Sequence, residues 1–298
     1  MYRIDGDVFD CFQAAVTVQL LKLKIDPMYI WASLEFGIEK ENDIYQIVNY
    51  RSKFEERMES LFSVQIKYTT SEKCGEEFLH GIVAGDIVRV DTFHLPYCIL
   101  FNREHSGHYI NIIKEEQDRY YIVDKYFSFE GYVTREEFKS ILEAPINSKY
   151  FTNCTKLTLA KNSDLVYVPL TIVERSLLQY IDGNFSTHMS KLKLLIKQKE
   201  IDLGDVYAAL KYTSNNRYHF RIFVEKYFCE TTVLHKKIRE TEVNWRTLAN
   251  FILLLNNDKN SVQLIENINQ RIDRIINYEF ETKKLLKIVL NQKGEESL

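Results

Sequence analysis

The stretch that most constrains the fold is Val90–Asp124, in which apolar and polar residues alternate on either side of a charged turn. The run His-Tyr-Ile-Asn-Ile-Ile begins at His108, and after the polar turn Lys114–Arg119 the run Tyr-Tyr-Ile-Val leads to Asp124. Alternation with a period of two around a short charged turn predicts an antiparallel hairpin. The start of the first strand then lies beside the end of the second, so His108 and Asp124 are expected at one rim of the sheet. A carboxylate in that place can orient the imidazole of a histidine that serves a nucleophile.

The composition indicates a globular protein without an electrostatic or membrane signature. The chain has 298 residues, 45% hydrophobic and 27% charged, which is enough for one large domain or two ordinary ones. Its net charge of −3 predicts no binding to nucleic acid or to anionic membrane. Apolar runs such as Phe251–Leu255 are far shorter than the roughly 20 residues of a spanning helix. The acidic residues of the N-terminus do not resemble a signal peptide, so a cytoplasmic location is expected.

Cysteine chemistry offers one candidate nucleophile. The cysteines are scattered and form no CxxC pair: Cys11, Cys74, Cys98, Cys154 and Cys229. This pattern predicts reduced thiols, no disulfide framework and no metal site, and His105 with His108 is expected to be a polar strand entry rather than a metal pair.

Position distinguishes Cys11 from the other cysteines. An apolar pattern with helical spacing follows it and ends before Asp26, so Cys11 falls in the first turn of a helix. The N–H groups and the positive dipole end of a helix N-terminus favour a thiolate. The alternative interpretation is a packed core thiol.

The order of elements predicts two domains. Helical patterns precede strand patterns in the first half, which indicates an α+β domain over residues 1–165. Near Lys161–Pro169 the character changes, and residues 166–298 are predicted to form an all-helical domain because apolar residues recur at helical spacing with little Gly or Pro. The helices expected there are Thr171–Tyr180, Thr187–Gln198, Leu203–Lys211, Asn216–Phe228, Trp245–Asn256 and Ser261–Leu290. Other expectations are a cap or tight turn at Gly37, a strand or helical turn at Asp43–Ile47, and edge strands at Lys156–Leu159 and Leu165–Val168.

The chain order Cys11, His108, Asp124 is that of papain-like thiol enzymes, with the cysteine on a helix and the other two on a hairpin. More narrowly, the segments VDTFHLPYCILF, HSGHYINII and YYIVDKYF resemble the signature of the butirosin biosynthesis protein H family, whose N-terminal domain is related to the C39 papain-like cysteine peptidases. The matching elements are Val90-Asp91, Leu95-Pro96-Tyr97, His108, Asp124, the Cys11 helix and the Phe-Gly turn in Leu34–Ile38. The resemblance covers about the first half of the chain.

This resemblance implies a papain-like fold followed by a helical domain, and a thiol acyltransferase of specialised metabolism such as antibiotic or nonribosomal peptide production. Cys11 would accept an acyl group from the thioester of an acyl or peptidyl carrier protein and pass it to a small-molecule amine or hydroxyl acceptor. His108 would be the base and Asp124 its orienting acid. No cofactor is implied beyond the phosphopantetheine that arrives on the carrier protein.

One departure concerns the oxyanion. Papain-like peptidases place a glutamine six residues before the cysteine, and Asp5 stands there in this chain, where a carboxylate would repel the oxyanion. Backbone N–H groups near Cys11, or Gln13, are the alternative donors. Gln13, His94, Tyr97 and Tyr109 are candidate substrate-binding residues, and His105 is another residue considered for the cleft. For the aromatic residues, packing in the core is the competing interpretation.

Two other functions stay open at this point. The same residues suit a cysteine peptidase or amide hydrolase, and a non-catalytic domain that binds a carrier protein is a third reading. The lysines Lys191, Lys193, Lys197 and Lys199 form either a docking surface for an acidic carrier protein or a solvated helix face. A homodimer formed through the helical domain is also left open.

Overall fold

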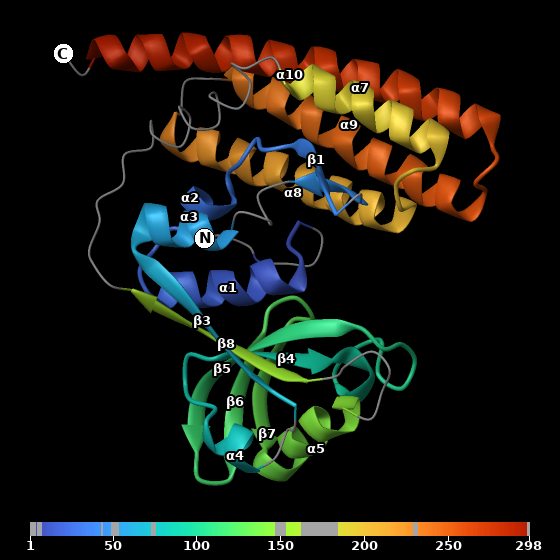
Figure 1. Ribbon diagram of the computed structural model, residues 1–298. Helices are drawn as coiled ribbons and strands as arrows, with labels where there is room; N and C mark the ends of the chain where they lie inside the picture. The colour runs from blue at the N-terminus through green and yellow to red at the C-terminus, as the bar shows by residue number, and fades with distance from the viewer. Residues whose placement is uncertain are drawn as a thin grey trace. The chain divides into compact units, whose positions relative to one another are not determined.

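The computed structural model describes residues 4, 8–42, 44–48, 54–72, 76–146, 153–161, 184–228 and 232–296. The fold is mixed α+β, with a six-stranded antiparallel sheet, a two-stranded sheet and helices. It divides into two compact units, one made of Met1–Pro27 with Arg57–Leu165 and the other of Met28–Glu56 with Val166–Leu298 (Figure 1). The sequence predicted a continuous first domain over residues 1–165. The structure differs, because Met28–Glu56 belongs to the second unit.

The first unit is built on the six-stranded sheet, whose order is β3-β8-β4-β5-β6-β7. Its strands are β3 (Val64–Ser71), β4 (Ile87–Asp91), β5 (Gly107–Glu116), β6 (Arg119–Asp124), β7 (Phe129–Thr134) and β8 (Cys154–Lys161). The predicted hairpin is confirmed as β5–β6, which is antiparallel with Glu116 opposite Arg119. The sequence did not predict β7, which extends the hairpin into a meander and sets Phe129 opposite Asp124.

Strand β8 corrects two expectations. It was predicted as an edge strand, but it lies between β3 and β4, with Leu157 opposite both Tyr68 and Ile87. Leu157 is fully buried, as a central strand requires. In addition, Cys154 is disulfide-bonded, so the expectation that all cysteines are reduced thiols is wrong for this residue.

The two faces of β5 have different partners. Ile110 and Ile112 point into an apolar core to which α4 (Glu76–His80) and α5 (Arg135–Ile146) also contribute. On the opposite face, α1 (Cys11–Lys22) packs against the strand: Gln19 Nε2 donates to Asn111 Oδ1 at 2.7 Å. The alternation of side chains along β5 therefore fixes α1 and its first residue against the sheet.

The second unit consists of helices and one hairpin. Its elements are α2 (Met28–Trp31), β1 (Gly37–Glu41), β2 (Ile44–Val48), α7 (Asn184–Gln198), α8 (Leu203–Tyr227), α9 (Thr232–Asn257) and α10 (Val262–Glu296), and α3 (Phe54–Phe62) contains the boundary between the units. The two helices expected over residues 203–228 are one helix, α8, because no Gly or Pro interrupts the chain between them. The hairpin shows that this unit is not entirely helical. The predicted elements Leu165–Val168 and Thr171–Tyr180 lie outside the described residues.

Specific contacts explain why Met28–Glu56 belongs to the second unit. The guanidinium of the buried Arg217 donates to the carbonyl of Leu34 at 3.0 Å. The backbone N–H of Ile38 donates to His188 Nδ1 at 3.0 Å, and the Phe36 ring lies 4.9 Å from that of Trp245. Gly37 begins strand β1 rather than forming the predicted cap or turn.

None of the helices within the described ranges has the length and apolar character needed to cross a membrane.

Candidate active site

Cys11 is the first residue of α1, and a capping box fixes the start of that helix. Asp10 Oδ1 accepts from the N–H of Gln13 at 2.8 Å, while Gln13 Oε1 accepts from the N–H of Asp10 at 3.0 Å. The Cys11 thiol is half-buried and donates to the carbonyl oxygen of Gly107, with Sγ and O 3.9 Å apart. The predicted position of Cys11 at a helix N-terminus is confirmed, and its sulfur lies beside the first residue of β5.

His108 and Asp124 form a buried pair at the rim of the sheet. His108 Nε2 lies 2.7 Å from Asp124 Oδ2, and the two side chains are only 2% and 1% exposed. The other carboxylate oxygen, Oδ1, accepts from the backbone N–H groups of Tyr126 and Phe127 at 3.1 and 3.2 Å. The predicted proximity of the two residues is thus confirmed. Because Nε2 is engaged with Asp124, Nδ1 is the ring nitrogen left for proton transfer.

The protonation of His108 links the pair to Cys11. Burial alone would lower the pKa of His108, but its hydrogen bond with Asp124 and its interaction with the Cys11 thiol outweigh burial and raise the pKa to about 9. The raised pKa favours the imidazolium form, in which both ring nitrogens carry a proton. His108 thus contacts Asp124 directly, and its pKa also responds to Cys11.

An aromatic wall flanks His108. The Phe127 ring lies 4.7 Å from the His108 ring, and the Tyr126 ring lies 5.6 Å from it. Burial raises the pKa of the Tyr126 phenol, and the nearby Cys11 and Asp10 add to the effect. Sequence reasoning did not select Tyr126 or Phe127, although both stand in the segment YYIVDKYF. Their nearness in sequence to Asp124 was the available signal.

Gln13 brings a hydrogen-bond donor close to the start of α1. Its side chain is fully buried, its Oε1 is used in the capping box, and its Nε2 has no hydrogen-bond partner among the described residues. The backbone N–H of Cys11, as the first helical residue, has no acceptor within the helix. Asp5, which stands where papain-like enzymes have glutamine, lies outside the described residues.

The two tyrosines predicted to line the cleft have different surroundings. The Tyr97 ring stacks on that of Phe129, with centroids 3.8 Å apart. Burial raises the pKa of the Tyr97 phenol, and the neighbouring Asp124 carboxylate adds to it, although the buried hydroxyl makes no hydrogen bond of good geometry. Tyr109 instead lies on the α1 face of β5, where its ring meets the Phe12 ring at 5.2 Å. The contact with Phe12 favours the packing interpretation for Tyr109. Tyr97 instead lies close to Asp124.

His94 belongs to a different cluster. Its ring contacts are with Phe93 and His105, at centroid distances of 5.1 and 6.1 Å. Burial lowers the pKa of His94, while the nearby Asp91 carboxylate opposes this effect. The structure groups His94 with Asp91 and His105 rather than with Cys11.

The predicted basic patch on α7 is partly engaged by other residues. Lys191 Nζ lies 4.6 Å from the centre of the Tyr45 ring, and Lys193 forms an ion pair with Asp273. Lys199 Nζ donates to Asn260 Oδ1 at 2.9 Å. These contacts favour a structural role for the helix face over a free docking surface.

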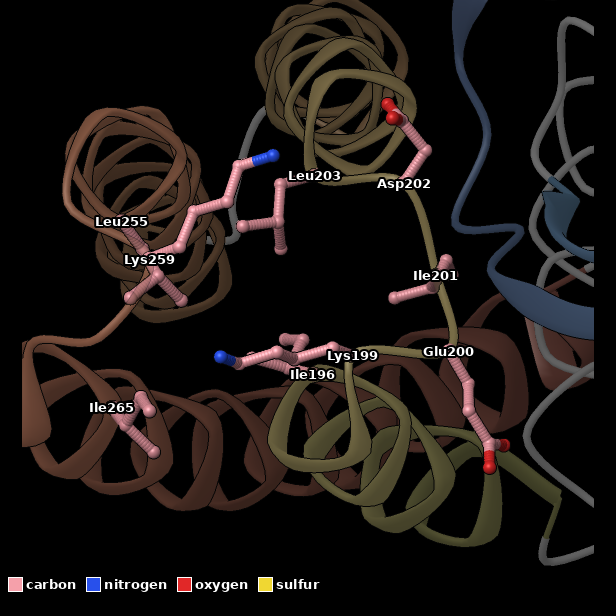
Figure 2. A pocket seen from close by; sticks show the side chains of 9 residues that line it. All are labelled: Ile196, Lys199, Glu200, Ile201, Asp202, Leu203, Leu255, Lys259 and Ile265. Atoms are coloured by element: carbon pink, nitrogen blue, oxygen red, sulfur yellow. The ribbon is translucent and has the colours of Figure 1, made fainter.

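A pocket of about 400 Å³ lies between the ends of helices in the second unit. Figure 2 shows its mixed lining of apolar and charged side chains: Ile196, Lys199, Glu200, Ile201, Asp202, Leu203, Leu255, Lys259 and Ile265. These residues come from the α7–α8 turn and from α7, α8, α9 and α10 or their ends. The sequence did not predict this pocket. Lys199 of the predicted basic patch lines it, whereas none of the catalytic or substrate-binding candidates does.

No protein-family model and no curated protein matches this chain.

Proposed function

We propose that this protein is a cysteine-dependent acyltransferase with a papain-like catalytic domain. It would move an acyl group from the thioester of an acyl or peptidyl carrier protein to an amine or hydroxyl acceptor. The observation that carries the proposal is the buried His108–Asp124 pair, 2.7 Å apart, whose histidine also interacts with the half-buried Cys11 thiol. A thiol, an imidazole and an orienting carboxylate are the groups that acyl transfer through a covalent intermediate needs. The motifs that resemble the butirosin biosynthesis protein H family support transfer from a carrier protein.

In the first step the Cys11 thiol passes its proton to His108 Nδ1, and the resulting thiolate attacks the thioester carbonyl carbon. A bond forms between Cys11 Sγ and that carbon, and the bond from the carbon to the phosphopantetheine sulfur breaks. The leaving thiolate takes the proton from His108 Nδ1, which the raised pKa of His108 keeps available at neutral pH. Asp124 holds the ring through Nε2, so that Nδ1 faces the reaction.

In the second step the acceptor amine attacks the acyl-enzyme. A carbon–nitrogen bond forms, the bond to Cys11 Sγ breaks, and the sulfur leaves as a thiolate. The amine proton goes to His108 Nδ1, which lost its proton in the first step. The cycle thus returns the protein to its starting protonation without a cofactor of its own.

The oxyanion of each tetrahedral intermediate needs donors, and two lie at the start of α1. We propose the backbone N–H of Cys11 and the Nε2 amide of Gln13, because this amide is buried and without a partner among the described residues. Preorganised donors of this kind contribute roughly 10²–10³-fold to the rate. They would replace the glutamine that papain-like peptidases carry six residues before the cysteine.

We also propose that the enzyme works in the cytoplasm in specialised metabolism, where carrier proteins bear acyl groups. The peptidase or amide hydrolase reading uses the same group with water as the acceptor, so the two readings differ in substrate and not in residues.

The test is to incubate the purified protein with an acyl-loaded carrier protein and to measure intact mass. We expect an acyl-enzyme adduct that is absent in Cys11→Ser, while Cys98→Ser, which removes a buried free thiol, keeps the adduct. His108→Ala should slow acylation by roughly 10²–10⁴-fold. Cleavage of peptides without reaction with thioesters would favour the hydrolase, and an adduct that persists in Cys11→Ser would contradict the assignment of the nucleophile.

A further inference from the structure

A second group of metal-ligating side chains lies where β4 ends. Asp91 is the last residue of β4, His94 ends the 3₁₀ turn Thr92–His94, and His105 lies just before β5. One ligand atom from each of these three residues lies within 4.8 Å of the others. The sequence predicted no metal site, because the cysteines form no CxxC pair and His105 with His108 was expected to be a polar strand entry. The set in the structure instead combines two imidazoles and one carboxylate.

The carboxylate of Asp91 is held in a fixed orientation. It is fully buried, and its Oδ1 accepts from the backbone N–H groups of Phe93 and Ser106, each at 3.1 Å. Its Oδ2 faces His105, with Nδ1 2.7 Å away. The Oδ1 atom therefore fixes the orientation of the carboxylate, and the Oδ2 atom points at the two histidines. Carboxylates that bind metal ions are commonly oriented by hydrogen bonds in this way.

The two histidines are held on a closed loop. The Phe93 ring stacks on the His105 ring at 4.2 Å with an interplanar angle of 12°. Thr92 closes the loop twice: its N–H donates to the carbonyl of Ser106 at 3.0 Å, and its hydroxyl donates to the carbonyl of Glu104 at 2.9 Å. In a 3₁₀ turn, residues three apart lie one above the other, which brings His94 over Asp91. The three candidate ligands therefore lie in or beside one loop whose two ends are already tied together by hydrogen bonds of Thr92.

We infer that Asp91, His94 and His105 form a binding site for one divalent transition metal ion, zinc in the first place. Two imidazole nitrogens and one carboxylate oxygen are ligands that Zn²⁺ takes readily, and water would complete the coordination. Bond lengths of about 2.0–2.2 Å set tetrahedral ligands roughly 3.3 Å apart, so the Asp91–His105 contact would open by roughly half an ångström and His94 would move inward. The His105 side chain is 30% exposed, so an ion can reach the site from solvent.

The competing explanation is that the Asp91–His105 hydrogen bond alone ties the loop. That explanation gives His94 no role, and it gives the cluster no affinity for metal. A proton on His105 Nδ1 would explain the 2.7 Å contact equally well, and metal binding would have to displace it. The two explanations therefore differ in stoichiometry, in proton release and in the effect of replacing His94.

The experiment is calorimetric titration of the full-length chain with Zn²⁺. Cys11→Ser serves as the parent protein so that the thiol near His108 does not contribute. We expect one saturable site that releases a proton, seen by repeating the titration in buffers with different ionisation enthalpies. His94→Gln and His105→Gln should each weaken binding by more than the roughly 10–100-fold that losing a supporting contact costs. Asp91→Asn is less informative, because Asp91 also holds the loop.

His80→Gln is the matched control. His80 Nε2 lies 3.8 Å from Glu76 on α4, and no third metal-ligating side chain joins this pair among the described residues. Its replacement should therefore leave zinc affinity unchanged. Co²⁺ gives a second readout, because a thiolate ligand would add a charge-transfer band in the near ultraviolet. Absence of saturable binding, an affinity in His94→Gln or His105→Gln unchanged from that of the parent protein, or a thiolate band would each overturn the inference. A single site lost in both histidine variants and kept in His80→Gln would establish it.

Discussion

Replacing Asp124 with asparagine should change how stability depends on pH. In the wild type, the folded state raises the pKa of His108 from its ordinary 6.5 to about 9. Folding therefore favours the protonated ring, and this stabilisation is fully present below pH 6.5 and is lost as pH rises towards 9. At 1.36 kcal/mol for each tenfold change in proton affinity, the difference between 6.5 and about 9 corresponds to roughly 3 kcal/mol.

In Asp124→Asn the effect of burial, which lowers the pKa, would no longer be opposed by the carboxylate. We expect the pKa of His108 to fall to its ordinary value or below it, so the decline in stability between pH 6.5 and 9 should disappear. Nuclear magnetic resonance titration of the His108 ring measures the pKa directly, which matters because a chain with two compact units need not unfold in two states. Urea unfolding at pH 6, 7.5 and 9 then gives the stability of both proteins.

The comparison between wild type and variant removes other contributions. Burial lowers the pKa values of His94 and His188, so both contribute in the opposite sense, with stability lost as pH falls. These contributions are common to both proteins and cancel in the difference. A wild-type His108 that titrates near 6.5, or identical pH profiles for both proteins, would refute the reasoning.

Two further substitutions test the elements that position the site and the second unit. Asp10→Ala removes one half of the capping box of α1 and should destabilise the protein by about 1 kcal/mol in chemical denaturation, while Asp10→Asn should restore most of the loss. Glu279→Gln breaks the buried pair with Arg217, whose atoms lie 2.8 Å apart with both side chains fully buried, and should cost roughly 3–5 kcal/mol in the same measurement. A small effect, no larger than that of replacing the exposed Lys139 on α5, would show that the buried pair is not needed for stability.

The parts of the site that the sequence predicted are those set by local patterns. The alternation around the turn was enough to place His108 and Asp124 at one rim, because an antiparallel hairpin is determined by residues close together in the chain. Cys11 was placed at a helix start by the apolar pattern that follows it. The capping residue Asp10 was not identified, although aspartate followed three residues later by glutamine is a known start signal.

The parts that were missed depend on contacts between distant segments. Nothing near β8 shows that it lies between β3 and β4, because both pairings involve residues far away in the chain. Likewise, Met28–Glu56 joins the second unit through contacts such as that of the Leu34 carbonyl with Arg217, which no local pattern reveals. For Tyr109 the sequence left cleft lining and core packing both open, and its contact with Phe12 of α1, which lies far away in the chain, favours packing.

The His108–Asp124 and His105–Asp91 pairs show how one local arrangement can serve two kinds of chemistry. In both, one carboxylate oxygen accepts two backbone N–H groups and the other lies 2.7 Å from an imidazole nitrogen. The difference is in what else surrounds the ring. His108 is 2% exposed and interacts with a thiol, which suits proton transfer to and from sulfur.

His105 is 30% exposed and stands beside His94, a second imidazole, which suits an ion that arrives from solvent. In the sequence, His105 and His108 are separated by Ser106 and Gly107. The Gly107 carbonyl accepts a hydrogen bond from the Cys11 thiol. Because Ser106 N–H also binds Asp91, an ion that repositions Asp91 would act on the backbone that holds Gly107 against the sulfur. Occupancy of the proposed metal site and the reactivity of Cys11 would then be coupled through four consecutive residues of one strand entry.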